Sequence, residues 1–146
     1  MSHEEALAAV PLFSQFSRKD LSRLSRAVVE RSYKKGETIV KEGEQAVAFF
    51  VITKGKVEVT HAAGARSSRL NDLGPGDAFG EMSLLDGGPR AATVKAVDDT
   101  TCLVLSRWDF VAELRTNPHI AVAMLPILSR RLREVEQKLA KQAATH

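Results

Sequence analysis

Apolar residues in the first thirty positions recur every three to four residues, which is the period of an α-helix. Ser17 precedes Asp20 at the spacing of a helix N-cap, and Pro11 and Phe16 interrupt the pattern. We therefore predict two short helices within about residues 4–31. The positions that define the period are Leu7, Val10, Leu12, Phe13, Leu21, Leu24 and Val28.

Between residues 33 and 105 the pattern changes to short runs of β-branched and aromatic residues separated by glycine. No long helical period interrupts these runs. This pattern favours an antiparallel barrel or jelly roll over a doubly wound sheet. The clearest strand candidates are residues 38–40, 49–53, 56–60, 94–97 and 101–105.

The helical period returns after Ser106, which is a suitable N-cap for a short helix over 107–115. A longer helix follows Asn117 and Pro118 and extends to about residue 142. It carries an apolar stripe with alternating spacings of three and four, too short for a free-standing coiled coil. We expect this stripe to pack on the β-roll, with a dimer interface or a movable lid as alternatives that can coexist with packing. The apolar stripe consists of Leu125, Leu128, Leu132, Val135 and Leu139.

Length and composition indicate a single domain in an intracellular protein. The chain has 146 residues, 44% of them hydrophobic, and the 21 basic and 18 acidic residues give a net charge of +3. These values exclude a disordered polyelectrolyte and a strongly basic nucleic-acid module. Apolar runs are short and the first residues lack a signal-peptide pattern, so we expect a cytoplasmic protein without a membrane partner. From residue 129 onward five basic and two acidic residues account for the net charge, which is typical of a solvated helix end.

The residues that usually perform catalysis or bind metals are scattered. The single cysteine, Cys102, lies in an apolar run and is expected in the core. Ser83 has no nearby histidine, so no nucleophilic site is indicated. We therefore predict no catalytic residues, no metal and no enzyme, and we disfavour a metal enzyme of the cupin type. The histidines, which form no His-x-His pair, are His3, His61, His119 and His146.

The most informative segment spans residues 79–94. Gly80 allows a close approach of the backbone, and one helical turn with free N–H groups follows it. Arg90 comes next with a planar fork of donors that suits a phosphate. Glu81 can accept hydrogen bonds from sugar hydroxyls, and the small Ala91 leaves space. The segment predicts a ligand with one phosphate and a sugar.

A purely structural interpretation of the same residues is that Glu81 complements the helix dipole and pairs with Arg90. In that case Phe79, Leu84 and Leu85 belong only to the core. A buried ion pair stabilises a fold weakly, because desolvation of both charges largely cancels their attraction. We therefore favour the ligand.

The segment from Gly80-Glu81 to Pro89-Arg90-Ala91-Ala92-Thr93-Val94 closely resembles the phosphate-binding cassette of the cyclic nucleotide-binding domain family. This family includes regulatory subunits of cyclic-AMP-dependent protein kinase, cyclic-nucleotide-gated channels and bacterial catabolite activators. The resemblance implies one domain over residues 1–146, an eight-stranded antiparallel β-roll (a double-stranded β-helix or jelly roll) with helices at both ends. Its parts are N-terminal helices at about 4–31, the β-roll with the cassette at about 33–105, and C-terminal helices at about 107–142.

The resemblance also implies roles. Arg90 binds the cyclic phosphate, Glu81 binds the ribose 2′-hydroxyl, and backbone groups complete the cradle. Ala91 stands where a threonine favours cyclic GMP, so cyclic AMP is the preferred ligand and cyclic GMP the second. The last helix lacks an aromatic residue, so the base cap falls to Arg130, Arg131 or Arg133. The complete predicted ligand site is Phe79, Gly80, Glu81, Met82, Ser83, Arg90, Ala91, Ala92 and Val94.

By resemblance the chain is a stand-alone sensor or a piece of a larger regulator, and it functions in signal transduction. We expect the C-terminal helix to move on ligand binding and to act on a protein partner that the sequence does not name. A homodimer through that helix is compatible with the stripe, and direct DNA binding is not expected. The alternatives are an interaction module of the same fold that has lost nucleotide binding or binds another effector, and a fragment of a transcription regulator.

Overall fold

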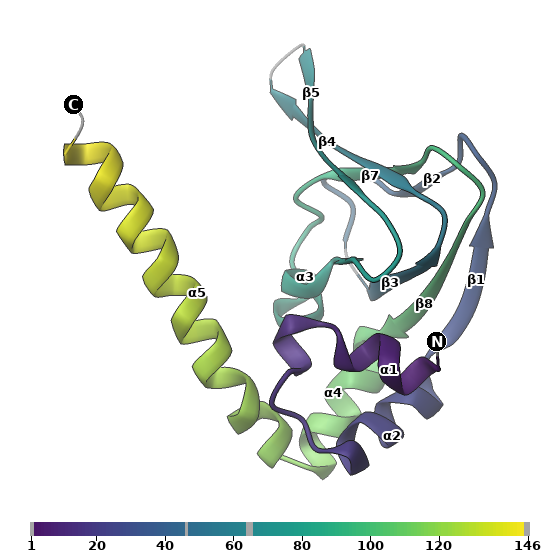
Figure 1. Ribbon diagram of the computed structural model, residues 1–146, viewed down its shortest axis with the longest axis vertical. Coiled ribbons are helices and arrows are strands. Elements are labelled where there is room, and N and C mark those ends of the chain that lie inside the picture. Colours follow the sequence, from purple (N-terminus) through teal and green to yellow (C-terminus); the bar gives the residue numbers. More distant parts are fainter. Residues whose placement is uncertain (1, 46, 64–65, 145–146) are drawn as a thin grey trace.

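The computed structural model describes residues 2–45, 47–63 and 66–144. Helices occupy both ends of the chain and strands occupy the middle, with one short helix inserted between strands (Figure 1). The helices are α1 (His3–Ala8), the 3-10 helix η1 (Pro11–Phe13), α2 (Arg18–Ala27), α3 (Glu81–Asp86), α4 (Arg107–Thr116) and α5 (His119–Ala144). The strands are β1 (Val29–Tyr33), β2 (Thr38–Val40), β3 (Ala48–Lys54), β4 (Val57–Ala63), β5 (Arg66–Leu73), β6 (Ala78–Phe79), β7 (Thr93–Ala96) and β8 (Thr100–Ser106).

The strands form two antiparallel sheets of four, in the orders β1-β8-β3-β6 and β2-β7-β4-β5. Strands distant in sequence are neighbours, as where β3 pairs with β8 and places Phe50 opposite Val104. This arrangement confirms the predicted eight-stranded antiparallel β-roll with helices at both ends.

Strands β3 and β8 are buried on both faces of their sheet, which explains the continuous apolar runs of these two strands. On β3, Phe49 and Val51 belong to a core shared with the helices. The alternate residues Phe50 and Ile52 belong to a second core between the two sheets. Cys102 is fully buried in this second core, as expected, and burial raises the pKa of its thiol to about 12.

Capping residues in the sequence correctly predicted the starts of α2 and α4. Ser17 and Asp20 form a reciprocal capping box at the start of α2, and the Ser106 side chain accepts a hydrogen bond from the Asp109 N–H in α4. The second predicted helix ends earlier than expected, because Val28 has extended backbone and β1 begins at Val29 to pair with β8. No apolar pattern predicts β5, since this polar strand lies at the sheet edge beside β4.

The apolar stripe of α5 does not pack on the β-roll, so that expectation is wrong. The buried residues of α5 are Ile120, Met124 and Ile127, on a different face and near the start of the helix. Beyond them α5 runs away from the roll (Figure 1). Leu125, Leu132, Val135 and Leu139 are 59%, 61%, 52% and 60% exposed, and Leu128 is partly buried.

Among the helices of the described ranges, none combines the length and apolar character that a membrane span requires.

Candidate functional site

Arg90 is a charged residue buried in the roll, since only 8% of it is exposed. One guanidinium nitrogen, Nη2, donates a hydrogen bond to the Ala48 carbonyl at 2.7 Å, and Cζ lies 5.6 Å from the centre of the Phe50 ring. The other, Nη1, is buried and has no hydrogen-bond partner in the described part of the protein. Burial lowers the pKa of the Arg90 guanidinium, an effect that Glu44 partly offsets. The site therefore holds a cation with an unused donor.

Gly80 permits this placement of Arg90. Its φ is +88°, and a Cβ atom at this position would lie 2.5 Å from Arg90 Nη1 and 3.2 Å from the Ala48 oxygen. Phe79, the preceding residue, stacks on Phe50 with ring centres 4.8 Å apart. Glycine is required here both for the left-handed backbone and for the close approach of the guanidinium.

A hollow of about 250 Å³ lies against Arg90 and the start of α3; we call it the cassette hollow. It brings together all nine residues of the predicted ligand site, from Phe79 to Val94. Val40 on β2 and Val59 on β4 complete the lining, and sequence reasoning missed them. Their only signal is an apolar character shared with many strand residues. The lining is Val40, Val59, Phe79, Gly80, Glu81, Met82, Ser83, Arg90, Ala91, Ala92 and Val94.

Glu81 does not pair with Arg90. Its carboxylate accepts two hydrogen bonds from Arg131 of α5, Nη1 to Oε1 at 2.8 Å and Nη2 to Oε2 at 3.2 Å. Both side chains are about one-third exposed. Of the three arginines predicted to cap a base, Arg131 thus contacts the cassette, while Arg130 and Arg133 are exposed. None of the three lines the described cassette hollow.

His61 on β4 reaches the rim of the site, which sequence reasoning did not foresee. Its Nδ1 lies 3.1 Å from the Ala91 carbonyl oxygen and forms an ion pair with Glu42 when protonated. The Glu42 N–H in turn donates to Thr93 Oγ1 at 3.0 Å. These contacts hold the segment around Ala91 against β4.

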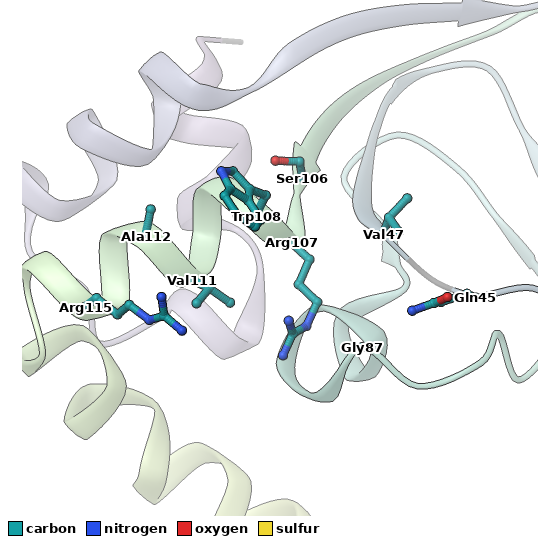
Figure 2. A pocket seen from close by; sticks show the side chains of 9 residues that line it. All are labelled: Gln45, Val47, Gly87, Ser106, Arg107, Trp108, Val111, Ala112 and Arg115. Carbon is teal, nitrogen blue, oxygen red and sulfur yellow. The ribbon is translucent and has the colours of Figure 1, made fainter.

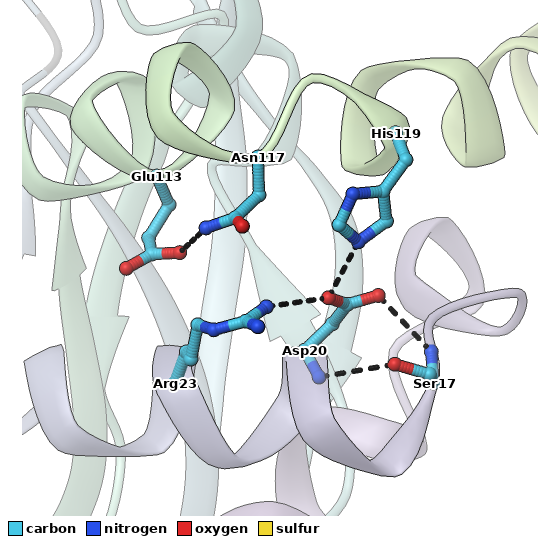
Figure 3. A network of polar contacts seen from close by, with 6 residues as sticks. All are labelled: Ser17, Asp20, Arg23, Glu113, Asn117 and His119. Carbon is cyan, nitrogen blue, oxygen red and sulfur yellow. Dashed lines mark hydrogen bonds and ion pairs between the residues drawn. The ribbon is translucent and has the colours of Figure 1, made fainter.

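A polar network holds the start of α5 on the N-terminal helices (Figure 3). His119 Nε2 lies 2.7 Å from Asp20 Oδ1, and Arg23 Nη1 donates to the same oxygen at 2.9 Å. Burial alone would raise the pKa of Asp20, which is 3% exposed, but hydrogen bonds from His119 and Ser17 outweigh burial and lower it. The base of α5 is therefore fixed.

The two other histidines do not form a cluster in the described part of the protein. His3 lies in α1 and His146 lies outside the described residues. Within the described ranges, no group of three or more His, Cys, Asp or Glu side chains could hold a metal ion. The arrangement around Arg90 has the chemistry of an anion-binding site.

Comparisons with known proteins agree with this geometry. A family model described as the cyclic nucleotide-binding domain matches residues 30–117, more than half of the chain. The chain belongs to the cyclic nucleotide-binding domain family, a family of regulatory domains and not of enzymes.

Among its relatives is the cyclic AMP receptor protein of Thermus thermophilus, 38% identical over 88% of this chain and 60% of that protein. The cAMP-dependent protein kinase regulatory subunit of Mycosarcoma maydis is 37% identical over 67% of this chain and 19% of that protein. The N-terminal domain of a transcriptional regulator from Streptomyces coelicolor has a similar crystal structure, with a TM-score of 0.83 and 31% identity over 92% of this chain and 94% of that one. The chain thus spans about three fifths of the receptor protein that it matches.

Proposed function

We propose that the cassette hollow binds a cyclic nucleotide, cyclic AMP in preference to cyclic GMP, and that the chain is a ligand sensor. The observation that carries this proposal is the buried Arg90 guanidinium, whose Nη1 has no described partner and which borders the hollow. A buried cation without an anionic hydrogen-bond partner is costly, and a bound phosphate would supply that partner.

The surrounding residues fit the rest of such a ligand. Glu81 lies at the start of α3, where its carboxylate can accept a hydrogen bond from a ribose hydroxyl. Gly80, Met82 and Ala92 also line the hollow with Arg90, where their backbone groups can complete the cradle. Ala91 offers no hydroxyl for a guanine, which supports the preference for cyclic AMP.

The contact between Glu81 and Arg131 supports a mechanism in which α5 responds to the ligand. A ribose that binds Glu81 competes with Arg131 for the same carboxylate oxygens. Nucleotide binding therefore changes the contact between α5 and the cassette. Pro126 lies between the anchored start and the exposed remainder of the helix and removes one backbone hydrogen-bond donor there. Ligand binding then shifts the population of α5 positions about a fixed base.

Titration calorimetry with cyclic AMP and cyclic GMP tests the binding proposal, on protein shown by mass spectrometry to be free of nucleotide. We expect micromolar or tighter binding of cyclic AMP and weaker binding of cyclic GMP. Arg90→Ala should abolish binding, whereas Arg90→Lys should retain part of it, because lysine keeps the charge but loses the planar fork. Absence of heat with either nucleotide would favour the alternative in which the fold has lost nucleotide binding or binds another effector.

Hydrogen exchange over residues 118–140 tests the movement of α5. We expect saturating cyclic AMP to change the exchange of this segment. Arg131→Ala should increase exchange in the ligand-free protein, and Arg130→Ala, at the exposed neighbouring position, should not. Exchange that is the same with and without cyclic AMP would show that the proposed mechanism is wrong.

A second candidate function is that of the sensor part of a transcription regulator. It is favoured by the likeness to the receptor protein of Thermus thermophilus and to the N-terminal regulator domain of Streptomyces coelicolor. Mobility-shift titration of duplex DNA over a range of salt concentrations tests whether this chain itself acts on DNA. We expect no shift by this chain, and a shift that requires cyclic AMP would favour direct action on DNA.

A further inference from the structure

A second groove, larger than the cassette hollow, lies where α4 meets the end of α3 and the segment before β3 (Figure 2). Its volume is about 500 Å³, and we call it the α4 groove. None of the nucleotide-site residues lines it. The described lining is Gln45, Val47, Gly87, Ser106, Arg107, Trp108, Val111, Ala112 and Arg115.

One wall of the α4 groove is an unpartnered helix face. Trp108, Val111, Ala112 and Arg115 follow the helical spacing of three and four, so they lie along one side of α4. Trp108 is 84% exposed, and Val47 on the opposite wall is 64% exposed. Large exposed side chains around a concave surface are typical of protein interaction sites.

The charge of the groove has one sign. Arg107 and Arg115 are its only ionisable lining residues among those described, and none of these is acidic. Figure 2 shows both guanidinium groups toward the middle of the groove. Arg107 donates a long hydrogen bond of 3.3 Å from Nη2 to the Leu85 carbonyl, and its buried Nε has no described partner. Two cations that line one groove attract an occupant that carries a carboxylate.

We propose that the α4 groove docks an acidic segment of a partner protein, with an apolar side chain between Trp108 and Val111 and a neighbouring carboxylate at Arg107 and Arg115. Two cations are few for a nucleic-acid surface, which neutralises many phosphates. A helix face with apolar anchors and flanking charge is instead suited to a peptide.

The walls of this groove connect directly to the cassette. The Arg107 N–H donates to the Val47 carbonyl at 2.8 Å, and the next carbonyl, that of Ala48, accepts from Arg90. Gly87 ends α3, and a Cβ atom there would lie 3.1 Å from Arg107 Nε. Docking should therefore respond to occupancy of the cassette hollow. This dependence rests on the proposed function, whereas docking itself does not.

Peptide selection tests the docking. A random peptide library displayed on phage is selected on the full chain and counter-selected on the Trp108→Ala/Arg115→Glu double variant. We expect enriched sequences with a large apolar residue beside Asp or Glu. A labelled peptide of such a sequence should lose at least about tenfold in affinity for the double variant. It should bind Lys35→Glu normally, since that exposed turn lies at the opposite end of β8 from Ser106.

Circular dichroism and thermal unfolding establish that each variant is folded. Absence of enrichment, enrichment of basic peptides, or equal binding to the double variant would overturn the docking proposal. So would perturbation of the amide signals of the α4 groove by duplex DNA and not by the selected peptide. The peptide is then titrated with and without saturating cyclic AMP. A change in peptide affinity supports the connection to the cassette, whereas cyclic AMP that binds without changing it overturns the connection and leaves docking intact.

Discussion

At the scale of single residues, the site depends on a guanidinium held by neutral groups. Arg90 rests on the Ala48 carbonyl and the face of the Phe50 ring, and its hydrogen bonds include no carboxylate among the described residues. Neutral partners fix the direction of the side chain without neutralising it. The cation therefore stays available to an anion, as the proposed function requires.

We expect Gly80→Ala to lower cyclic AMP affinity by about tenfold or more, because the new methyl group displaces Arg90. Gly76→Ala is the matched control: its φ is +92°, but a Cβ atom there meets nothing within 4 Å. Both variants carry the same backbone strain of about 1–2 kcal/mol. Calorimetry on both separates the clash from the strain, and equal affinities would contradict the role given to Gly80.

Ala91 is predicted to set the choice of base. We expect Ala91→Thr to raise cyclic GMP affinity by about fivefold, because a hydrogen bond to guanine contributes about 1 kcal/mol. Ala91→Val has nearly the same shape without the hydroxyl and should bring no such gain. Competition titrations with both nucleotides give the ratio of the cyclic AMP and cyclic GMP affinities for each variant. A similar gain with valine would assign the effect to packing.

At the scale of elements, α5 has two different halves. Its start is anchored by the burial of Ile120 and Met124 and by the contact of His119 with Asp20 (Figure 3). Its later half touches the cassette through Arg131 and otherwise exposes its apolar stripe. A helix that is fixed at one end and held further along by one partly exposed ion pair is suited to a change of position, since such pairs contribute about 0.2–1 kcal/mol.

Asp20→Asn should loosen the anchor of α5 and destabilise the protein by about 1–3 kcal/mol at neutral pH. The pKa of Asp20 is lowered in the folded state, mainly by hydrogen bonds from His119 and Ser17 that overcome the effect of burial. Its stabilisation is therefore complete above the ordinary value of 3.8 and is lost as pH falls through the lower folded-state pKa.

Urea unfolding of the wild-type protein and of Asp20→Asn, at neutral pH and at about pH 3, tests this pH dependence. The difference in unfolding free energy should shrink at the lower pH. Asp109→Asn, at the corresponding cap position of α4, serves as the control, because the Asp109 carboxylate accepts its hydrogen bond from the Ser106 hydroxyl. A difference that stays constant with pH would contradict the assignment to Asp20.

At the scale of the whole molecule, the α5 stripe is an apolar surface that the described chain leaves uncovered. Four of its residues are more than half exposed on one helix that leaves the roll (Figure 1). A stripe with heptad spacing pairs well with a second copy of itself. We therefore propose a homodimer through α5.

Leu132→Glu should weaken that dimer by about tenfold or more, because it places a charge in the middle of the stripe. Gln137→Glu adds the same charge outside the stripe and should leave the dimer intact. Sedimentation velocity over a range of protein concentrations measures the change. A protein that is monomeric throughout, or that responds equally to both substitutions, would show that α5 does not form the interface.

The sequence by itself determined the local structure and the chemistry of the cassette. Helix caps, strand runs and glycine turns are encoded by neighbouring residues, so the caps Ser17 and Ser106 and five of the strands were predictable. The cassette is one continuous segment, and its nine predicted residues lie around one hollow. Edge strand β5 escaped prediction because its polar sequence carries no apolar period.

Only the tertiary structure decided which distant groups meet. The pairing of Glu81 with Arg131, fifty positions later, depends on the direction in which α5 leaves the roll. That direction also exposes the apolar stripe, which the sequence pattern alone assigned to packing. Likewise, Val40, Val59 and His61 reach the site because antiparallel pairing places β2 and β4 beside β7. Such contacts depend on the relative placement of whole elements, which the periodicity of one segment does not encode.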